Sequence, residues 1–157
     1  MEIRQFLIDS FRYNDYANKL VLNKIKALPD KEEALKLYSH LINSQYKWLA
    51  RITDNENSVK LDWFGPVYSL DEIENKWEHS LGKWINFLSL KTEEQMFEYV
   101  VYTGQDGGKW TAMLKDIAIQ LNNHSIHHRA QIQKIIRQQG LEPDFVDYIG
   151  TVCKKLS

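Results

Sequence analysis

Several residue types are scarce in this chain, and each shortage excludes a class of structure. Cys153 is the only cysteine among 157 residues, so no internal disulfide can form and a reducing, cytoplasmic setting is expected. No stretch approaches the roughly 18 consecutive apolar residues of a membrane-spanning helix, so we expect no membrane partner. The first eleven residues carry Glu2, Arg4 and Asp9 and no unbroken apolar segment, which argues against a secretory signal.

Neither sign of charge is in large excess. Lysine plus arginine total 20 and aspartate plus glutamate total 21, which gives a net charge of −1. Proteins that bind nucleic acid normally carry a basic surplus on one face, so we expect no nucleic-acid partner. Apolar residues make up 43% of the chain, an ordinary globular share, and residues 1–157 are expected to form one folded domain.

Proline is also scarce, and Pro29, Pro66 and Pro143 divide the chain. Apolar residues recur at helical spacing in four long segments, which together predict an all-α four-helix bundle. Ser69 with Glu72 has the spacing of a capping box, and Gly140 is suited to end the last long helix. The predicted helices cover about 2–28, 30–53, 69–88 and 111–139.

The segments between and after these helices have other residue patterns. Residues 54–69 begin polar and end in aromatics with Gly65-Pro66, which indicates an ordered loop. From Phe97 to Tyr102 apolar and other residues alternate before a glycine-rich turn at 104–108, which predicts a short β-hairpin or an extended crossover between helices three and four. The tail, 141–157, is expected to add a short C-terminal helix or to dock along the bundle.

The apolar rows of the first two helices predict their inward faces. In the first helix, one row places Leu7, Val21 and Leu28 inward with Asn14 among them, and the adjacent row holds Phe6, Tyr13 and Leu20. A buried, hydrogen-bonded polar residue is the commoner explanation of Asn14. The second helix is expected to turn four residues inward: Leu37, Leu41, Trp48 and Ile52.

The five histidines are not equivalent. His124 and His128 are four residues apart, about 40° on the helical wheel, and fall within the apolar stripe of the last long helix. Imidazoles at this spacing can share one metal ion, although such pairs also occur by chance. His40 lies at the edge of the second helix's stripe, so it can face the pair without being required to. His127 and His79 are expected to point outward.

One local string is more specific than these patterns. The run Leu121-Asn-Asn-His-Ser-Ile-His-His-Arg-Ala-Gln-Ile132 resembles the signature of the DinB-like (DinB/YfiT) superfamily of metalloenzymes. Tyr13-Asn14 followed by Ala17-Asn18 matches its first-helix signature, and His40 matches its single histidine in the second helix. The tail, with Gly140 and Pro143, matches more loosely, and Ala130 replaces the family's usual glycine.

The resemblance implies a set of site residues. Its three metal-binding histidines correspond to His40, His124 and His128. Gln131 shares the inner face and is interpreted as a partner of the cofactor site, with a packing role as the alternative. Asn14 is a candidate to line the pocket, together with Asn18 and Tyr102. Arg129 points sideways on the wheel, where a salt bridge is expected.

Such a site has a recognisable chemistry. Three neutral imidazoles leave one divalent ion its full charge and at least one free position, as in catalytic rather than structural zinc sites. Zinc is favoured, and nickel, iron and manganese remain open. Better-understood branches of the superfamily imply a metal-dependent, thiol S-transferase-like enzyme of stress or detoxification, using a low-molecular-weight thiol such as bacillithiol or mycothiol, or activating water. No residue stands out as a general base.

The sequence is compatible with two further hypotheses about function. The protein could be a non-catalytic, metal-containing protein that binds a small ligand, or a helical packing protein without metal. The partner is expected to be a small-molecule substrate. Three aromatics in or beside loops, Trp63, Phe64 and Trp110, could form the pocket mouth or a dimer surface, and related proteins favour a homodimer.

Overall fold

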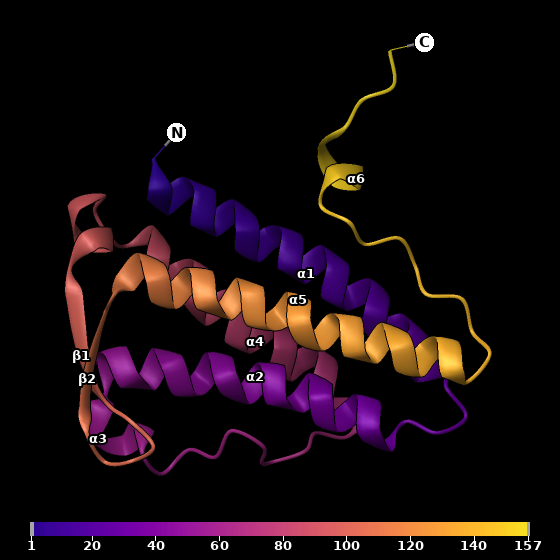
Figure 1. Ribbon diagram of the computed structural model, residues 1–157, viewed down its shortest axis with the longest axis horizontal. Coiled ribbons are helices and arrows are strands. Elements are labelled where there is room, and N and C mark those ends of the chain that lie inside the picture. Colours follow the sequence, from indigo (N-terminus) through magenta and orange to yellow (C-terminus); the bar gives the residue numbers. More distant parts are fainter. Residues whose placement is uncertain (1, 157) are drawn as a thin grey trace.

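A computed structural model describes residues 2–156 and is mostly helical (Figure 1). In this range the chain forms six α-helices, one 3-10 helix and one two-stranded antiparallel sheet. In chain order the elements are α1 (Ile3–Ala27), α2 (Glu32–Thr53), α3 (Asn55–Ser58), α4 (Leu70–Ser89), η1 (Glu94–Phe97), β1 (Tyr99–Thr103), β2 (Lys109–Met113), α5 (Leu114–Gln138) and α6 (Ile149–Val152).

Local chemistry sets the ends of the long helices. Leu28, which precedes Pro29, is extended with φ −64° and ψ 141°, because a following proline disfavours the helical conformation. α4 opens with the predicted capping box, in which Ser69 and Glu72 satisfy each other's backbone N–H groups. After α5, Gly140 has φ +84°, a left-handed conformation that favours glycine.

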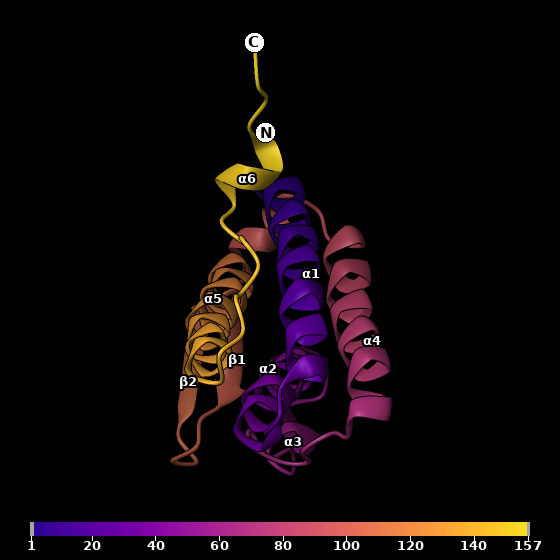
Figure 2. The same cartoon turned by 90° about the vertical axis from the view of Figure 1, so that its right-hand side faces the viewer.

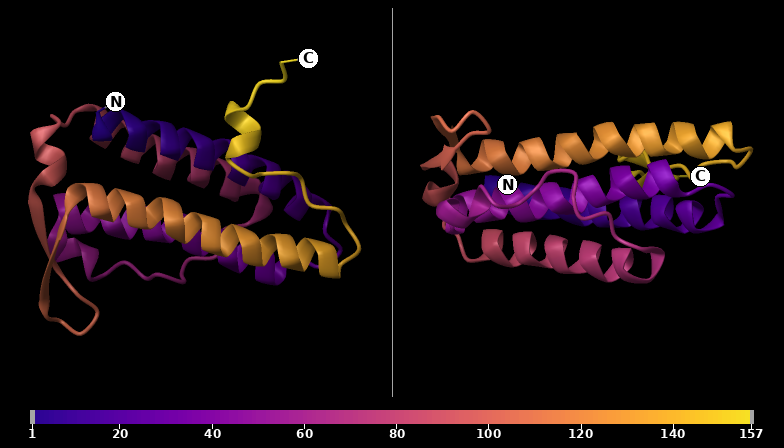
Figure 3. Two further views of the ribbon diagram at one scale, coloured as in Figure 1. Left: turned by 45° about the horizontal axis from the view of Figure 1, so that its top comes forward. Right: turned by 90° about the horizontal axis from the view of Figure 1, so that it is seen from below.

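The four long helices run lengthwise beside one another, with α5 and α4 on opposite sides of α1 and α2 (Figure 3). α5 packs on both α1 and α2, and α4 packs on the same two helices from the other side (Figure 2). None of the helices in residues 2–156 combines the length and apolar character needed to cross a membrane.

The crossover between α4 and α5 is a β-hairpin. β1 and β2 pair antiparallel from Tyr99 opposite Met113 to Thr103 opposite Lys109, and the glycine-rich turn joins them. In Figure 1 the hairpin crosses the left-hand ends of the long helices, where β1 contacts α2 and β2 leads directly into α5. Of the two predicted forms of this segment, the hairpin is the correct one.

The core confirms the first predicted row of α1 and contradicts the second. Leu7, Val21 and Leu28 are buried, as is Asn14, whereas Phe6 is 47% exposed and Tyr13 is only partly buried. α1 lies between α4 and α5, so its buried arc follows those two contacts and leaves the second row at the edge.

The inward face predicted for α2 is also displaced. Leu41 is buried as expected, but the other three predicted residues are only partly buried. Ala34, Tyr38 and Ile42 have essentially no exposed surface instead. α2 packs against both α4 and α5, and its centre of burial lies between those two contacts rather than along the one predicted stripe.

Candidate metal centre

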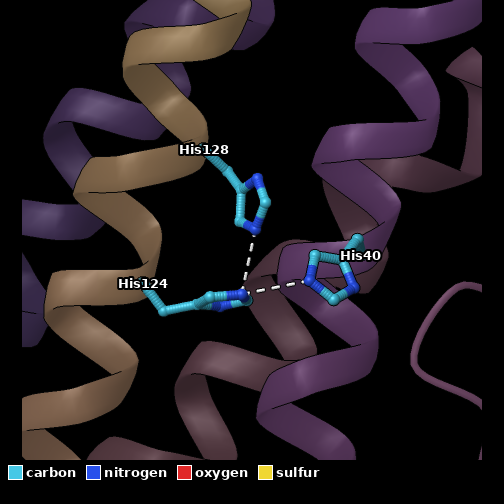
Figure 4. Close-up of side chains that lie close together, drawn as sticks. All are labelled: His40, His124 and His128. Atoms are coloured by element: carbon cyan, nitrogen blue, oxygen red, sulfur yellow. Dashed lines mark hydrogen bonds between the residues drawn. The ribbon is translucent and has the colours of Figure 1, made fainter.

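Three histidine rings from two helices converge on one point (Figure 4). His40 comes from the middle of α2, and His124 and His128 come from successive turns of α5. The Nε2 atom of His124 lies 3.0 Å from Nε2 of His40 and 3.0 Å from Nε2 of His128. One ring nitrogen from each residue falls in a group within 4.8 Å of one another. The prediction that these side chains meet is confirmed.

The opposite ring nitrogens fix the tautomers of two rings. Nδ1 of His40 lies 2.7 Å from the backbone carbonyl oxygen of Trp63, and Nδ1 of His128 lies 2.7 Å from Oε1 of Gln131. Both oxygens can only accept, so each Nδ1 carries the proton and donates it. In the neutral rings, Nε2 of His40 and of His128 therefore presents a lone pair to the convergence point.

This donor set fits a divalent ion. Nε2 of His124 can donate a proton to only one of its two neighbours, so at least two lone pairs face each other without a hydrogen between them. A cation at the centre relieves that repulsion. Two nitrogens that each lie about 2.0–2.1 Å from one ion are at most about 4.2 Å apart. The two separations from Nε2 of His124, 3.0 Å each, fall within that limit, and the three nitrogens all lie within 4.8 Å of one another.

Burial keeps the α5 pair in the form that binds metal. Desolvation, aided by the neighbouring His128 and His40 rings, lowers the pKa of His124 from 6.5 to about 4. Desolvation also lowers the pKa of His128, against the opposing effect of the hydrogen bond to Gln131. Both rings are thus neutral at neutral pH, with lone pairs free for an ion.

The loop after α3 holds the His40 ring in place. The Phe64 ring stacks on His40 with a centroid distance of 4.6 Å and an interplanar angle of 9°. Nδ2 of Asn43 donates to the carbonyl of Pro66 at 3.0 Å, and the backbone N–H of Tyr68 donates to Oγ of Ser39 at 2.9 Å. The predicted ordered loop is thus fastened to the same helix that carries His40.

A second polar cluster lies on the other buried face of α5. Arg129 was expected to form a salt bridge at the side of the helix, and that prediction is wrong. Arg129 is 3% exposed, and its guanidinium donates to Oδ1 of Asn14 and Oδ1 of Asn18, both at 3.0 Å, and to Oη of Tyr13 at 3.2 Å. Asn14 also donates to Asn122. These bonds join α1 to α5.

The histidines open into a pocket of about 550 Å³. Its walls include His40 and His124, and Tyr102 lines it as predicted, whereas Asn14 and Asn18 do not. Trp63, Phe64 and Trp110 all line the pocket. Of the two roles predicted for these loop aromatics, pocket mouth or dimer surface, their position supports the pocket mouth. The other lining residues are Ser44, Trp48, Arg51, Gly104, Gln105, Asp106 and Gln120.

Comparison with known protein families agrees with this geometry. A family model described as the DinB family matches residues 4–154, nearly the whole chain. The chain belongs to the DinB family. Searches of curated proteins and of solved structures gave no match. The matched residues include all three histidines, and the reaction of this DinB-family protein is left to be argued from the site.

The sequence pattern indicates the three histidines but not all of the residues around them. Gln131, interpreted as either a partner of the site or a packing residue, contacts the site by its bond to His128. Ser44 and Arg51 were not predicted, although they follow His40 by four and eleven residues and so share its face of α2. Asn14 stays a prediction as a cofactor-site residue, and the structure places it in the Arg129 cluster.

Proposed function

We propose that His40, His124 and His128 bind one divalent metal ion and that this protein is a metal-dependent enzyme acting on a small molecule. The observation that carries the proposal is the convergence of three Nε2 atoms, two of them with their lone pairs directed inward by bonds at Nδ1. Zinc is favoured among the possible ions. We also propose that the four long helices form the four-helix bundle of DinB-like proteins.

Some residues of the chain orient the histidine rings, and others form the walls of the pocket in front of them. The Trp63 carbonyl and the Gln131 amide orient two of the rings, and aromatic side chains form much of the pocket wall in front of them. A bound divalent ion would lower the pKa of a thiol or water beside it and supply an anionic nucleophile at neutral pH.

The reaction we favour is thiol transfer. The sulfur of a low-molecular-weight thiol would form a bond to an electrophilic carbon, the leaving group would depart with its electron pair, and the thiol proton would go to solvent. Among the described residues no carboxylate contacts the three histidines, and Asp106 in the pocket wall accepts hydrogen bonds from Trp110 and Gly108. This is the reason for placing activation of the nucleophile at the histidine site rather than at an acid.

The metal is tested first. We expect about one divalent ion per chain in native protein by elemental analysis and a large loss in His124→Ala, which removes the nitrogen that lies close to both others. His79→Ala is the matched control, because His79 is exposed and bonds to Tyr46 away from the site. Equal, negligible metal in native protein and His124→Ala would end the metal hypothesis.

Catalysis is tested separately. Conjugation of a model electrophile is followed with several biological thiols, with and without added metal. Turnover that depends on metal and disappears in His124→Ala supports the enzyme. Tight metal binding without turnover of any thiol favours the second function, a non-catalytic protein that holds metal and a small ligand.

We further propose a homodimer. Phe6, Ile126 and Tyr148 are each about half exposed and surround one shallow, mostly apolar hollow of about 310 Å³ where α1, α5 and the tail meet. Light scattering should give twice the chain mass, and Ile126→Asp should lower it. A monomer at micromolar concentration would contradict this proposal and leave the metal site untouched.

A further inference from the structure

The pocket in front of the histidines contains buried donors with no partner. In residues 2–156, four buried side-chain polar atoms make no hydrogen bond, and three of them belong to pocket residues: Oγ of Ser44, Nε of Arg51 and Nε1 of Trp63. Buried polar groups in folded proteins are nearly always hydrogen-bonded, because leaving one unpaired costs about 1–3 kcal/mol. All three belong to residues that line one pocket, so the unpaired polar groups of the described chain concentrate beside the histidines.

Arg51 is the strongest of these donors. Its side chain is 5% exposed, and it forms no ion pair and donates no hydrogen bond to any described residue. Its guanidinium carbon lies over the rings of Trp48, Trp63 and Tyr102, at 4.5, 4.8 and 4.9 Å from their centroids. Aromatic faces hold the cation in place without neutralising it.

Arg51 and Lys47 place two buried cations beside this end of the pocket, whose wall also holds Asp106, a carboxylate that already accepts hydrogen bonds from Trp110 and Gly108. Lys47 is also buried, lies 5.0 Å from the Trp63 ring centroid and donates to the carbonyl of Leu61. Neither Lys47 nor Arg51 has a carboxylate within ion-pair distance among the described residues. A buried unpaired cation is unfavourable unless an anion joins it, so this end of the pocket favours a negatively charged group.

The helix sets the distance between this cation and the histidines. Arg51 follows His40 by eleven residues on α2, about 20° apart on the wheel and roughly 16 Å apart along the axis. Helical side chains lean toward the N-terminus, which brings the guanidinium toward His40. Ser44 lies between them on the same face, and both ends belong to one pocket. An extended small molecule can therefore reach both.

We propose that the pocket binds a small organic anion whose carboxylate or phosphate group pairs with Arg51, while the opposite end of the molecule lies at the three histidines. The aromatic walls contact its apolar body. Arginine suits this role, because its planar fork matches both oxyanions with two parallel bonds. This inference names the substrate class for the proposed function and rests on it only for the chemistry at the histidines.

Calorimetric titration of the metal-containing protein with three matched probes tests the proposal. The probes are 4-phenylbutyrate, 4-phenylbutyl phosphate and the uncharged 4-phenylbutanol. We expect at least one anion to bind about tenfold or more tightly than the alcohol, as a charge-assisted hydrogen bond predicts. The tighter of the two anions identifies the preferred oxyanion. Equal binding of all three probes, or no binding of any, overturns the inference, since ordered water then satisfies the donors.

Variants locate the anion. Arg51→Met should remove the preference for the anion, and Arg137→Met, which removes an exposed arginine from α5, should retain it. A preference that persists in Arg51→Met means that the anion binds at the histidine metal or elsewhere, and contradicts the proposal. Circular dichroism checks folding, and the three-probe comparison on the unaltered protein stands if Arg51→Met does not fold.

Metal analysis of the same samples separates the two proposals. Native protein without metal but with an Arg51-dependent anion preference would refute the metal-dependent function alone. Metal-containing protein without that preference would refute the anion site alone.

Discussion

Arg51 and Arg129 are both buried, yet their surroundings are opposite. Arg129 donates to Asn14, Asn18 and Tyr13, so its charge is solvated by fixed oxygens. Arg51 touches aromatic rings and donates to nothing in the described chain. The first therefore stabilises the fold, whereas the second is held ready for a partner from outside.

This contrast predicts different costs of removal. Arg129→Met leaves Oδ1 of both Asn14 and Asn18 buried without that donor, and each such loss costs about 1–3 kcal/mol. Arg51→Met leaves no acceptor unpaired and should lower the free energy of unfolding much less. Urea denaturation of both variants, with Arg137→Met as the exposed control, measures the difference. A larger loss in Arg51→Met than in Arg129→Met would show that this assignment of roles is reversed.

Gln131 controls one metal ligand through its tautomer. Gln131→Leu removes the acceptor of the His128 Nδ1 proton, so the ring can turn and the proton can move to Nε2. Loss of such an outer partner typically weakens metal binding about 10–100-fold. Competition with a chromophoric chelator measures the affinity. Gln138→Leu, at the end of the same helix, should bind metal as the native protein does, and unchanged affinity in Gln131→Leu would rule out this orienting role.

At the scale of elements, the loop over residues 59–69 acts on the site through α2. Asn43 both donates to the Pro66 carbonyl and accepts from the Tyr68 hydroxyl. Asn43→Ala should loosen this loop, raise its amide hydrogen exchange and weaken metal binding through the His40–Trp63 bond, while the helical content stays the same. Asn86→Ala, exposed on α4, is the control. Unaltered exchange in the loop would contradict the coupling.

The sequence predicted the long helices well, because their signals are local. Pro29, the Ser69–Glu72 capping box and Gly140 each act on the backbone within one turn. Arg129 was misplaced for a reason that is not local. α5 packs on two neighbours, α1 and α2, so it buries a second, polar face whose partners lie more than 100 residues away in the chain. The apolar stripe of α5 does not predict a second buried face that is polar.

The site could be predicted only as far as its motif extended. The spacing of His124 and His128 indicated a shared metal ion. His40 lay at the edge of its apolar stripe, so only the family resemblance indicated that it was the third ligand. Arg51 carried no comparable signal, because an isolated charged residue near the end of a helix is usually solvated. Its role depends on Trp63 and Tyr102, which the loop and the hairpin bring to α2 from elsewhere in the chain.

For the whole molecule, the neutral histidines make the stability of metal-free protein depend on pH. The pKa of His124 is about 4 in the folded chain against an ordinary value of 6.5, so the unfolded chain binds more protons between these values. The stabilisation is complete above pH 6.5, declines as the pH falls toward 4, and declines no further below that from this group. Urea unfolding of chelator-treated protein across this range should show the decline.

A variant isolates the contribution of this group. His124→Ala should reduce the dependence between pH 6.5 and 4, leaving the part due to His128, whose pKa burial also lowers, and His79→Ala should leave it unchanged. Stability that stays constant, or that increases on acidification through this window, would be incompatible with a buried neutral ring at position 124.

The His40 ring is oriented by a main-chain oxygen, and every amino acid offers that oxygen. Substitutions at position 63 can therefore reshape the wall beside Arg51 while the protonation of His40 stays the same. Evolution can alter ligand preference along this loop without rebuilding the histidine cluster. Closely related chains are thus free to keep one chemistry and diverge in the molecules on which they use it.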